Sequence, residues 1–429
     1  MFVRAVSVFK ILVCASLLTI GAIQTQAEPA SKYHRATIHP SIVNLDTGKT
    51  QQFRTAIVAT RLMAAASPTE VKWSVNDIPG GNAEVGTIDA NGLYTAPASA
   101  PTPREIHIGA EVPEAANRFL FATVIIGPGE PVYTSIHSWS ENPKAEDGSA
   151  HMSSPHGIGL DKEDNVLIAD QVGNKVLRYS KTGEFIGEIG KGSGSEPGQF
   201  REPREVRSDV EGNIFVTDSK GDRPRVQVFA HDGTFKQIFA EKGRWQGMLL
   251  RAHGMGFDAQ RRLFVVDVDN MAVKVYDKDG KSLYDWGTEG LNPGQFNAPH
   301  GLFVDRSGDV FVTGYYGPTQ KFNNEGDFVT AFAHGDPPDG AIYFHSVSGD
   351  KWGNAYLSVR SKEGYDGAIQ RGGKPVSIIK FNNNGDFVTS WAYSAPEHTE
   401  SEVAVANDGT VYALFKSEKA VGVETFVQK

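Results

Sequence analysis

Cysteine is almost absent from this chain of 429 residues, and Cys14 is its single copy. Cys14 lies inside an apolar run near the N-terminus, so the rest of the sequence contains no thiol. Intramolecular disulfides and thiolate metal sites are therefore excluded. The chain must obtain its stability from the packing of hydrophobic cores.

An excess of basic residues is also lacking. Lys and Arg together number 42 against 51 Asp and Glu, which gives a formal net charge of −9. A nucleic-acid partner requires a basic face, so this balance argues against nucleic-acid binding. Long apolar runs are missing after residue 27, and we expect no membrane-spanning helix.

Residues 1–27 have the pattern of a signal peptide. Arg4 and Lys10 supply the positive start, and the 13-residue run ILVCASLLTIGAI supplies the apolar centre. The small residues TQA, ending at Ala27, form a cleavage site. We therefore expect export to the periplasm or the cell exterior, with a mature chain that begins at Glu28.

Residues 33–127 alternate apolar and polar positions over short runs such as ATIHPSIVNL and REIHIGAEV. This alternation predicts the antiparallel strands of a β-sandwich. The phrase VKWSVNDIPGGNAEVGTIDANGLYTAP resembles bacterial Ig-like domains, and the resemblance implies a spacer or adhesion module without chemistry of its own. A linker over residues 128–131 follows.

Residues 132–429 repeat with a period near 48 residues. Six positions, separated by steps of 45 to 56 residues, share one column: His156, Arg204, His253, His300, His345 and Ser401. Each copy carries β-rich runs such as IFVTD, and five copies carry a second hairpin turn such as KDGK. Four strands per copy predict a six-bladed β-propeller, so the fold class is all-β, with an Ig-like β-sandwich followed by the propeller. A strand within residues 132–139 is expected to pair with the last copy and close the ring.

The phrases SEPGQFREPREV, NPGQFNAPHGLFVD and VTDSKGDRPRVQVF resemble NHL repeats. The resemblance spans residues 132–429 and implies the propeller fold. It does not select one function, because this architecture hosts scaffolds, binding platforms and enzymes alike.

The shared column predicts a site. The first strand of each blade lines the central channel, so equivalent positions form a ring around the axis. Imidazoles from several sides bind zinc and leave one position open. We therefore expect a divalent metal, zinc, at four histidines: His156, His253, His300 and His345. Arg204 in the same ring would bind a carboxylate of the ligand. The alternative is that the repeats inherited the histidine from a common ancestral unit, and that it only forms hydrogen bonds along the channel.

The histidine phrases, such as PHGIGLD, are also similar to those of the lyase that cleaves peptidyl-α-hydroxyglycine, a six-bladed NHL-type propeller. The resemblance implies zinc on the four histidines, Tyr316 as proton acceptor and Arg360 as the group that binds the carbonyl. In that family an aspartate directly follows one zinc histidine. Here other residues follow: Gly157, Gly254, Gly301 and Ser346. Tyr316 and Arg360 are alternatively rim residues of adjacent blades.

Three functions are consistent with this sequence. The first is an exported binding module for a small molecule, a peptide or a protein, with a divalent metal at the ring. The second is a zinc-dependent lyase for hydroxyglycine peptides or related substrates, and the third is a metal-free interaction scaffold. A second column, 14 residues after the ring, is expected only to cap backbone turns: Asp170, Asp218 and Asp267.

Overall fold

The computed structural model of the protein describes residues 34–58, 66–143, 151–219, 224–333, 342–361, 370–371, 374–394, 400–417 and 419–429. All the regular secondary structure in these parts is β-strand, which confirms the prediction of an all-β chain. No helix with the length and apolar character needed to cross a bilayer occurs in the described parts. The predicted signal peptide, residues 1–27, lies outside them.

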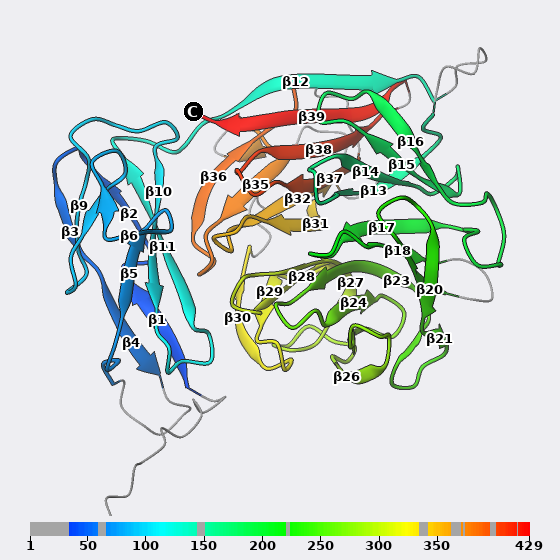
Figure 1. The fold of residues 1–429 in the computed structure, drawn as a ribbon, viewed down its shortest axis with the longest axis horizontal. Helices are drawn as coiled ribbons and strands as arrows, with labels where there is room; N and C mark the ends of the chain where they lie inside the picture. The colour runs from blue at the N-terminus through cyan, green and yellow to red at the C-terminus, as the bar shows by residue number, and fades with distance from the viewer. Residues whose placement is uncertain are drawn as a thin grey trace, which may run out of the picture.

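The N-terminal part consists of three sheets that share one hydrophobic core (Figure 1). The first sheet pairs β1 (Arg35–His39) with β4 (Arg54–Val58). The second has the order β2 (Ile42–Leu45), β11 (Phe119–Ile126), β10 (Glu105–Glu111), β5 (Lys72–Val75) and β6 (Ile78–Pro79). The third has the order β3 (Thr50–Gln52), β9 (Leu93–Thr95), β8 (Gly86–Ile88) and β7 (Gly81–Asn82). Phe53, Val75 and Ile108 have no exposed surface in this core, as expected from the alternation in sequence.

Six four-stranded antiparallel sheets make up the rest of the described chain. The first two are β13 (Pro155–Leu160), β14 (Val166–Asp170), β15 (Lys175–Tyr179) and β16 (Phe185–Ile189), and then β17 (Pro203–Ser208), β18 (Ile214–Asp218), β19 (Arg225–Phe229) and β20 (Phe235–Phe239). The next two are β23 (Ala252–Phe257), β24 (Leu263–Asp267), β25 (Ala272–Tyr276) and β26 (Ser282–Trp286), and then β27 (Asn297–Val304), β28 (Val310–Tyr316), β29 (Thr319–Phe322) and β30 (Phe328–Phe332).

The fifth sheet contains β31 (Ile342–Gly349), β32 (Ala355–Ser361), β35 (Ile378–Phe381) and β36 (Phe387–Trp391). The sixth contains β37 (Glu400–Val405), β38 (Val411–Lys416), β39 (Val421–Gln428) and β12 (Tyr133–Glu141). Two short pairs are accessory to the six sheets: β21 (Glu241–Lys242) with β22 (Met248–Leu249), and β33 (Gln370–Arg371) with β34 (Lys374–Pro375).

The sixth sheet joins the two ends of the repeat region. β12 pairs with β39 from Tyr133 opposite Gln428 to Glu141 opposite Val421, which confirms the predicted closure by the strand after the linker. The first strands of successive sheets contact one another in the order β13, β17, β23, β27, β31 and β37, and β37 contacts β13 again. The sheets therefore form a closed cycle with their first strands innermost (Figure 1).

Aspartates from two columns hold each copy in register. Asp161, at the end of the first strand, accepts the backbone N–H groups of Glu163 and Asn165 at 2.9 Å and so closes the following hairpin. Asp170, from the second column, accepts N–H groups of Ser153 and Ser154 at 2.7 and 2.8 Å. The second-column aspartates therefore cap the backbone that leads into the first strand in three copies, as expected.

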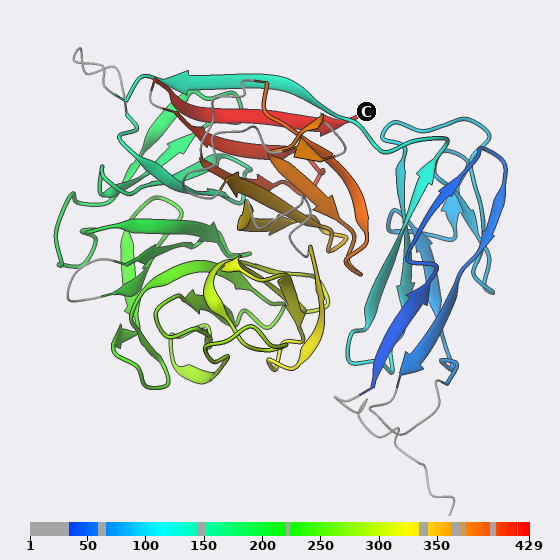
Figure 2. The same ribbon diagram turned by 180° about the vertical axis from the view of Figure 1, so that it is seen from behind.

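The N-terminal sheets are docked against the repeat region (Figures 1 and 2). The Arg35 guanidinium donates two hydrogen bonds to the Asp309 carboxylate, at 2.9 and 2.5 Å. Glu105 of β10 pairs with Lys380 of β35 at 2.7 Å, and both side chains are buried in the contact. The two parts are therefore joined by buried charged groups as well as by the linker.

This docking contact lies at the far end of the first strands. Asp309 follows the end of β27, and Asn384, in the turn after β35, donates to the Phe121 carbonyl at 3.2 Å. A strand advances by about 3.4 Å per residue, so the start of β27 near His300 lies at the opposite face. The N-terminal sheets thus dock away from the strand starts that carry the predicted ring.

Candidate histidine site at the ring axis

The starts of the first strands bring the four predicted histidines together. The His253 and His300 ring centroids are 4.1 Å apart, and those of His300 and His345 are 4.0 Å apart. The His156 ring lies 5.7 Å from both His300 and His345, and 5.4 Å from His253. Residues up to 189 positions apart in sequence therefore form one cluster, because the closed cycle places equivalent positions around one axis.

Three of the four histidines are arranged to share one ion. Nitrogens of His156, His300 and His345 all lie within 4.8 Å of one another, whereas His253 lies beside this triad without belonging to it. Carbonyl oxygens fix two of these rings: His156 Nδ1 donates to Arg204 O and His300 Nδ1 donates to His345 O, each at 3.1 Å. With its proton on Nδ1, each ring presents the lone pair of Nε2, the form that binds metal.

Burial favours the neutral form of three of these four imidazoles. Loss of hydration lowers the pKa of His156, His253 and His300 well below the usual 6.5. The neighbouring charge of Arg204 lowers the pKa of His156 further. Nε2 of His300 and Nε2 of His345 are buried and have no hydrogen-bond partner among the described residues. A buried nitrogen without a partner is costly, and a bound metal ion would satisfy it.

Two buried glutamates lie beside the ring, and the sequence analysis missed both. Glu402 Oε1 is 2.6 Å from His345 Nδ1, a close contact outside hydrogen-bond angles. Glu205 directly follows Arg204, and Glu402 directly follows Ser401. Both glutamates therefore stand one residue after the repeat column that forms the ring. Burial raises the pKa of Glu205 to about 8, and the charge of Glu402 adds to this rise while Arg207 opposes it. Carboxylates behind ligating histidines are a common second layer of metal sites.

Arg204 is held by the protein itself. One of its Nη groups donates to Glu202, which also accepts a hydrogen bond from Gln171. The Arg204 side chain is 19% exposed, so its charge faces the ring but only part of its guanidinium fork is available to a ligand.

The two predicted catalytic residues, Tyr316 and Arg360, differ in how they lie relative to the histidine ring. Tyr316 is 51% exposed, and the ring contacts come instead from Tyr315, whose centroid lies 5.1 Å from His300 and 5.7 Å from His345. Successive side chains of a strand point to opposite faces. Tyr315 therefore faces the histidines, and Tyr316, the next residue, points away from them. Arg360, near the end of β32, is close enough for its charge to lower the pKa of His156.

The glycine that follows three of the ring histidines has a packing role. A Cβ atom on Gly254 would lie 2.5 Å from Leu302 N and 2.6 Å from His300 O, and one on Gly301 would lie 2.8 Å from Val347 N. Neighbouring first strands therefore approach too closely for a side chain at Gly254 or Gly301. The recurring His-Gly pair thus combines a site residue with a residue that lets the strands converge.

We predict that Gly254→Ala lowers the free energy of unfolding by about 1–3 kcal/mol, because an overpacked core must shift its backbone. Ser346 occupies the same column in β31, where the structure already accommodates a side chain, so Ser346→Ala is the matched control with an expected loss below about 1 kcal/mol. Urea unfolding of both variants measures the difference. Equal losses would show that close strand approach does not constrain this column.

The closed cycle of repeated four-stranded sheets, with a polar cluster at its axis, defines a β-propeller. NHL repeat-containing protein 3 of Mus musculus is 29% identical over 148 residues, a match that covers 32% of this chain and 43% of the length of that relative. Protein brain tumor of Drosophila melanogaster is 30% identical over 113 residues, which covers 25% of this chain and 11% of that protein. These matches support an NHL-type β-propeller.

No family model matches the chain. A protein of unknown function from Bacteroides thetaiotaomicron has a similar solved structure, with a TM-score of 0.49 and 13% identity over 92% of this chain and 98% of that one. This likeness assigns no activity.

Proposed function

We propose that the protein is an exported six-bladed NHL β-propeller, with an N-terminal Ig-like domain, that binds a divalent metal ion and a ligand at the histidine ring. The observation that carries the proposal is the triad of His156, His300 and His345, whose nitrogens lie within 4.8 Å of one another. Three imidazoles are the protein ligands of an open zinc site, which leaves a fourth position for water or ligand.

The surroundings of the triad fit a cation. The buried, unpartnered Nε2 atoms of His300 and His345 would gain a ligand. The carboxylate of Glu402 beside His345 would offset the positive charge of the ion and hold the ring in place. The charges of Arg204 and Arg360 lie near the same histidines and favour a ligand that carries a carboxylate or a polarised carbonyl.

The second candidate is a lyase for hydroxyglycine peptides or a related hydroxylated substrate, and the contact of Tyr315 with two triad histidines favours it. A bound zinc ion would supply Lewis-acid chemistry. In this proposal Tyr315, rather than Tyr316, would accept the proton of the substrate hydroxyl, and Arg360 would orient the carbonyl. Tyr315→Phe should then abolish turnover of a hydroxyglycine peptide, while Tyr316→Phe should leave it unchanged.

Metal analysis of the mature protein, purified without chelators or a histidine tag, tests the proposal. We expect about one zinc or similar ion per chain, lost in His300→Ala and retained in His253→Ala, since His253 lies outside the triad. A chelator should lower the melting temperature of the wild type and leave that of His300→Ala unchanged. A wild type without metal, and with the same melting curve in chelator, would contradict the proposal and favour the metal-free scaffold.

A further inference from the structure

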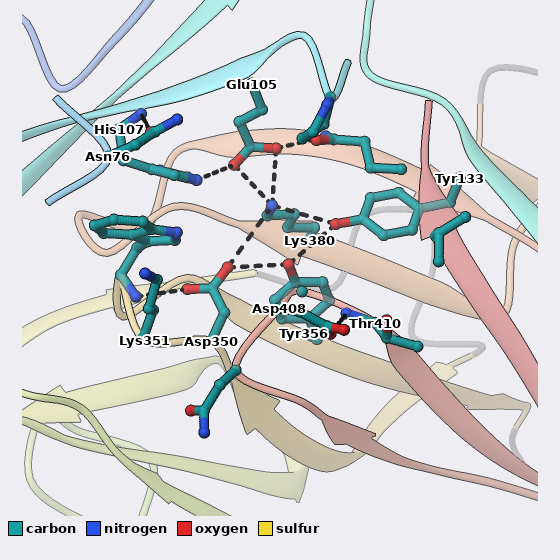
Figure 3. A pocket seen from close by; sticks show the side chains of 16 residues that line it. Asn76, Glu105, His107, Tyr133, Asp350, Lys351, Tyr356, Lys380, Asp408 and Thr410 are labelled. Carbon is teal, nitrogen blue, oxygen red and sulfur yellow. Dashed lines mark hydrogen bonds and ion pairs between the residues drawn. The ribbon is translucent and has the colours of Figure 1, made fainter. Parts of the chain in front are cut away.

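A second site lies between the two parts of the protein, at the face opposite the histidine ring. A cavity of about 460 Å³ opens where the N-terminal sheets meet the propeller (Figure 3). Asn76 and His107 line it from the N-terminal side, and Lys380, Thr410 and Gln428 line it from the propeller. Its volume is within the range of small-molecule sites, which occur preferentially at domain interfaces.

Four charged groups of the cavity are already in ion pairs (Lys380, Glu105, Asp350 and Lys351), whereas the Asp408 carboxylate is exposed to solvent. Lys380 Nζ lies 2.7 and 2.8 Å from the two carboxylate oxygens of Glu105 and 3.9 Å from Asp350 (Figure 3). Lys351 is paired with Asp77 at 3.1 Å. A charged ligand would have to displace these pairs, and an apolar ligand would remove water from them without compensation. The lining therefore favours a neutral ligand that is rich in hydrogen-bonding groups.

Four side chains around the cavity keep hydrogen-bonding capacity that no contact among the described residues uses. Asn76 accepts a backbone N–H through Oδ1 at 2.8 Å, which leaves its NH₂ group. Gln428 donates to a buried carboxylate at 2.6 Å, which leaves its Oε1. Asp408 accepts the Thr410 N–H at 2.9 Å through Oδ1, which leaves its second oxygen and the Thr410 hydroxyl. The opening is therefore lined by both donors and acceptors.

We propose that this cavity binds a small neutral polyhydroxylated molecule, a mono- or disaccharide. Each sugar hydroxyl both donates and accepts, so the hydroxyls of one sugar can pair with an amide NH₂, an amide oxygen, a carboxylate and a hydroxyl. Asn76 belongs to the N-terminal part and the other three residues belong to the propeller. The bound sugar therefore bridges the two parts and stabilises their docking by mass action. The inference is independent of the metal site.

Calorimetry and saturation-transfer NMR on the mature protein test it with glucose, galactose, mannose, N-acetylglucosamine and their β-linked disaccharides. We expect saturable binding of at least one sugar and a rise in melting temperature. Thr410→Phe, which fills the cavity, should weaken binding by about tenfold or more. Asn76→Asp keeps the oxygen that accepts the backbone N–H and removes the NH₂ donor, so it should also weaken binding. His300→Ala should bind the sugar like the wild type.

Three results would overturn the inference. The first is no saturable binding by any sugar of the panel. The second is unchanged binding in both Thr410→Phe and Asn76→Asp when their circular dichroism spectra match the wild type. The third is tighter binding of acetate or ammonium ions than of any sugar in the same cavity, which would show that the site selects charge. None of these results depends on whether the histidine ring holds metal.

Discussion

Glu105→Ala is expected to lower the free energy of unfolding by about 3–5 kcal/mol, because it leaves the Lys380 ammonium buried without its main counter-charge. Burial opposes ionisation of Glu105, but the ammonium 2.7 Å away outweighs it and lowers the pKa of Glu105. Burial likewise opposes the charge of Lys380, and the Glu105 carboxylate raises its pKa nonetheless. Each charge is therefore kept in the interface by the other.

Urea unfolding of Glu105→Ala against the wild type measures this loss, and proteolysis in the linker over residues 128–131 reports whether the N-terminal part is released. The double variant Glu105→Leu/Lys380→Met is the matched control. Removing both charges should recover most of the stability, since well-packed apolar residues often replace a buried ion pair at little cost. A loss below about 1 kcal/mol for Glu105→Ala would contradict the conclusion that each charge of this buried pair depends on the other.

His107 is expected to make the folded protein sensitive to acid. Burial lowers the pKa of His107 to about 4, and this effect outweighs the Glu105 carboxylate, 3.5 Å from its Nε2. In the unfolded chain the same group has a pKa near 6.5. Between these values the unfolded chain binds more protons than the folded one, so stability is fully present above pH 6.5 and decreases as pH falls toward 4. The contribution lost across this window is about 3 kcal/mol.

His107→Phe isolates this effect, because phenylalanine can keep the stack on Trp352, whose ring centroid lies 4.6 Å from that of His107. We expect the wild type to lose about 2–3 kcal/mol more than the variant between pH 7.5 and pH 4.5, as measured by urea unfolding at both pH values. The buried ring histidines, which lie far from His107, contribute to the acid sensitivity of both proteins alike. Parallel curves for the two proteins would contradict the lowered pKa of His107.

The sequence was sufficient to predict the repeat region. The period near 48 residues and the hairpin turns predicted the four-stranded units, because a strand and its tight turn depend on local residue choice. The pairing of β12 with β39 also followed, since the alternating strand after the linker matched the outer strands of the other copies. The column of histidines predicted that His156, His253, His300 and His345 would gather at one end of the first strands.

The finer chemistry of the ring was not predictable in the same way. Tyr315 and Tyr316 are equivalent in sequence, and only the register of β28 against β27 decides which one faces the histidines. Glu205 and Glu402 stand one residue after the ring column, so an alignment extended by one position would have found them. The approach of Glu402 to His345 still depends on how neighbouring strands pack. Nothing in the sequence indicated that His253 would lie beside the triad.

The docking of the N-terminal part was also beyond the sequence. Glu105 and Lys380 are 275 residues apart, and neither shows a pattern that distinguishes it from a surface charge.

The sequence by itself determined the strands, the repeat and the column that gathers the histidines, because these follow from periodicity and from local backbone preference. The tertiary structure alone decided which nitrogens converge, which tyrosine faces them and which charges are buried between the two parts. These features depend on distances of a few ångströms between strands that are far apart in sequence, and packing fixes such distances only when the whole ring has closed.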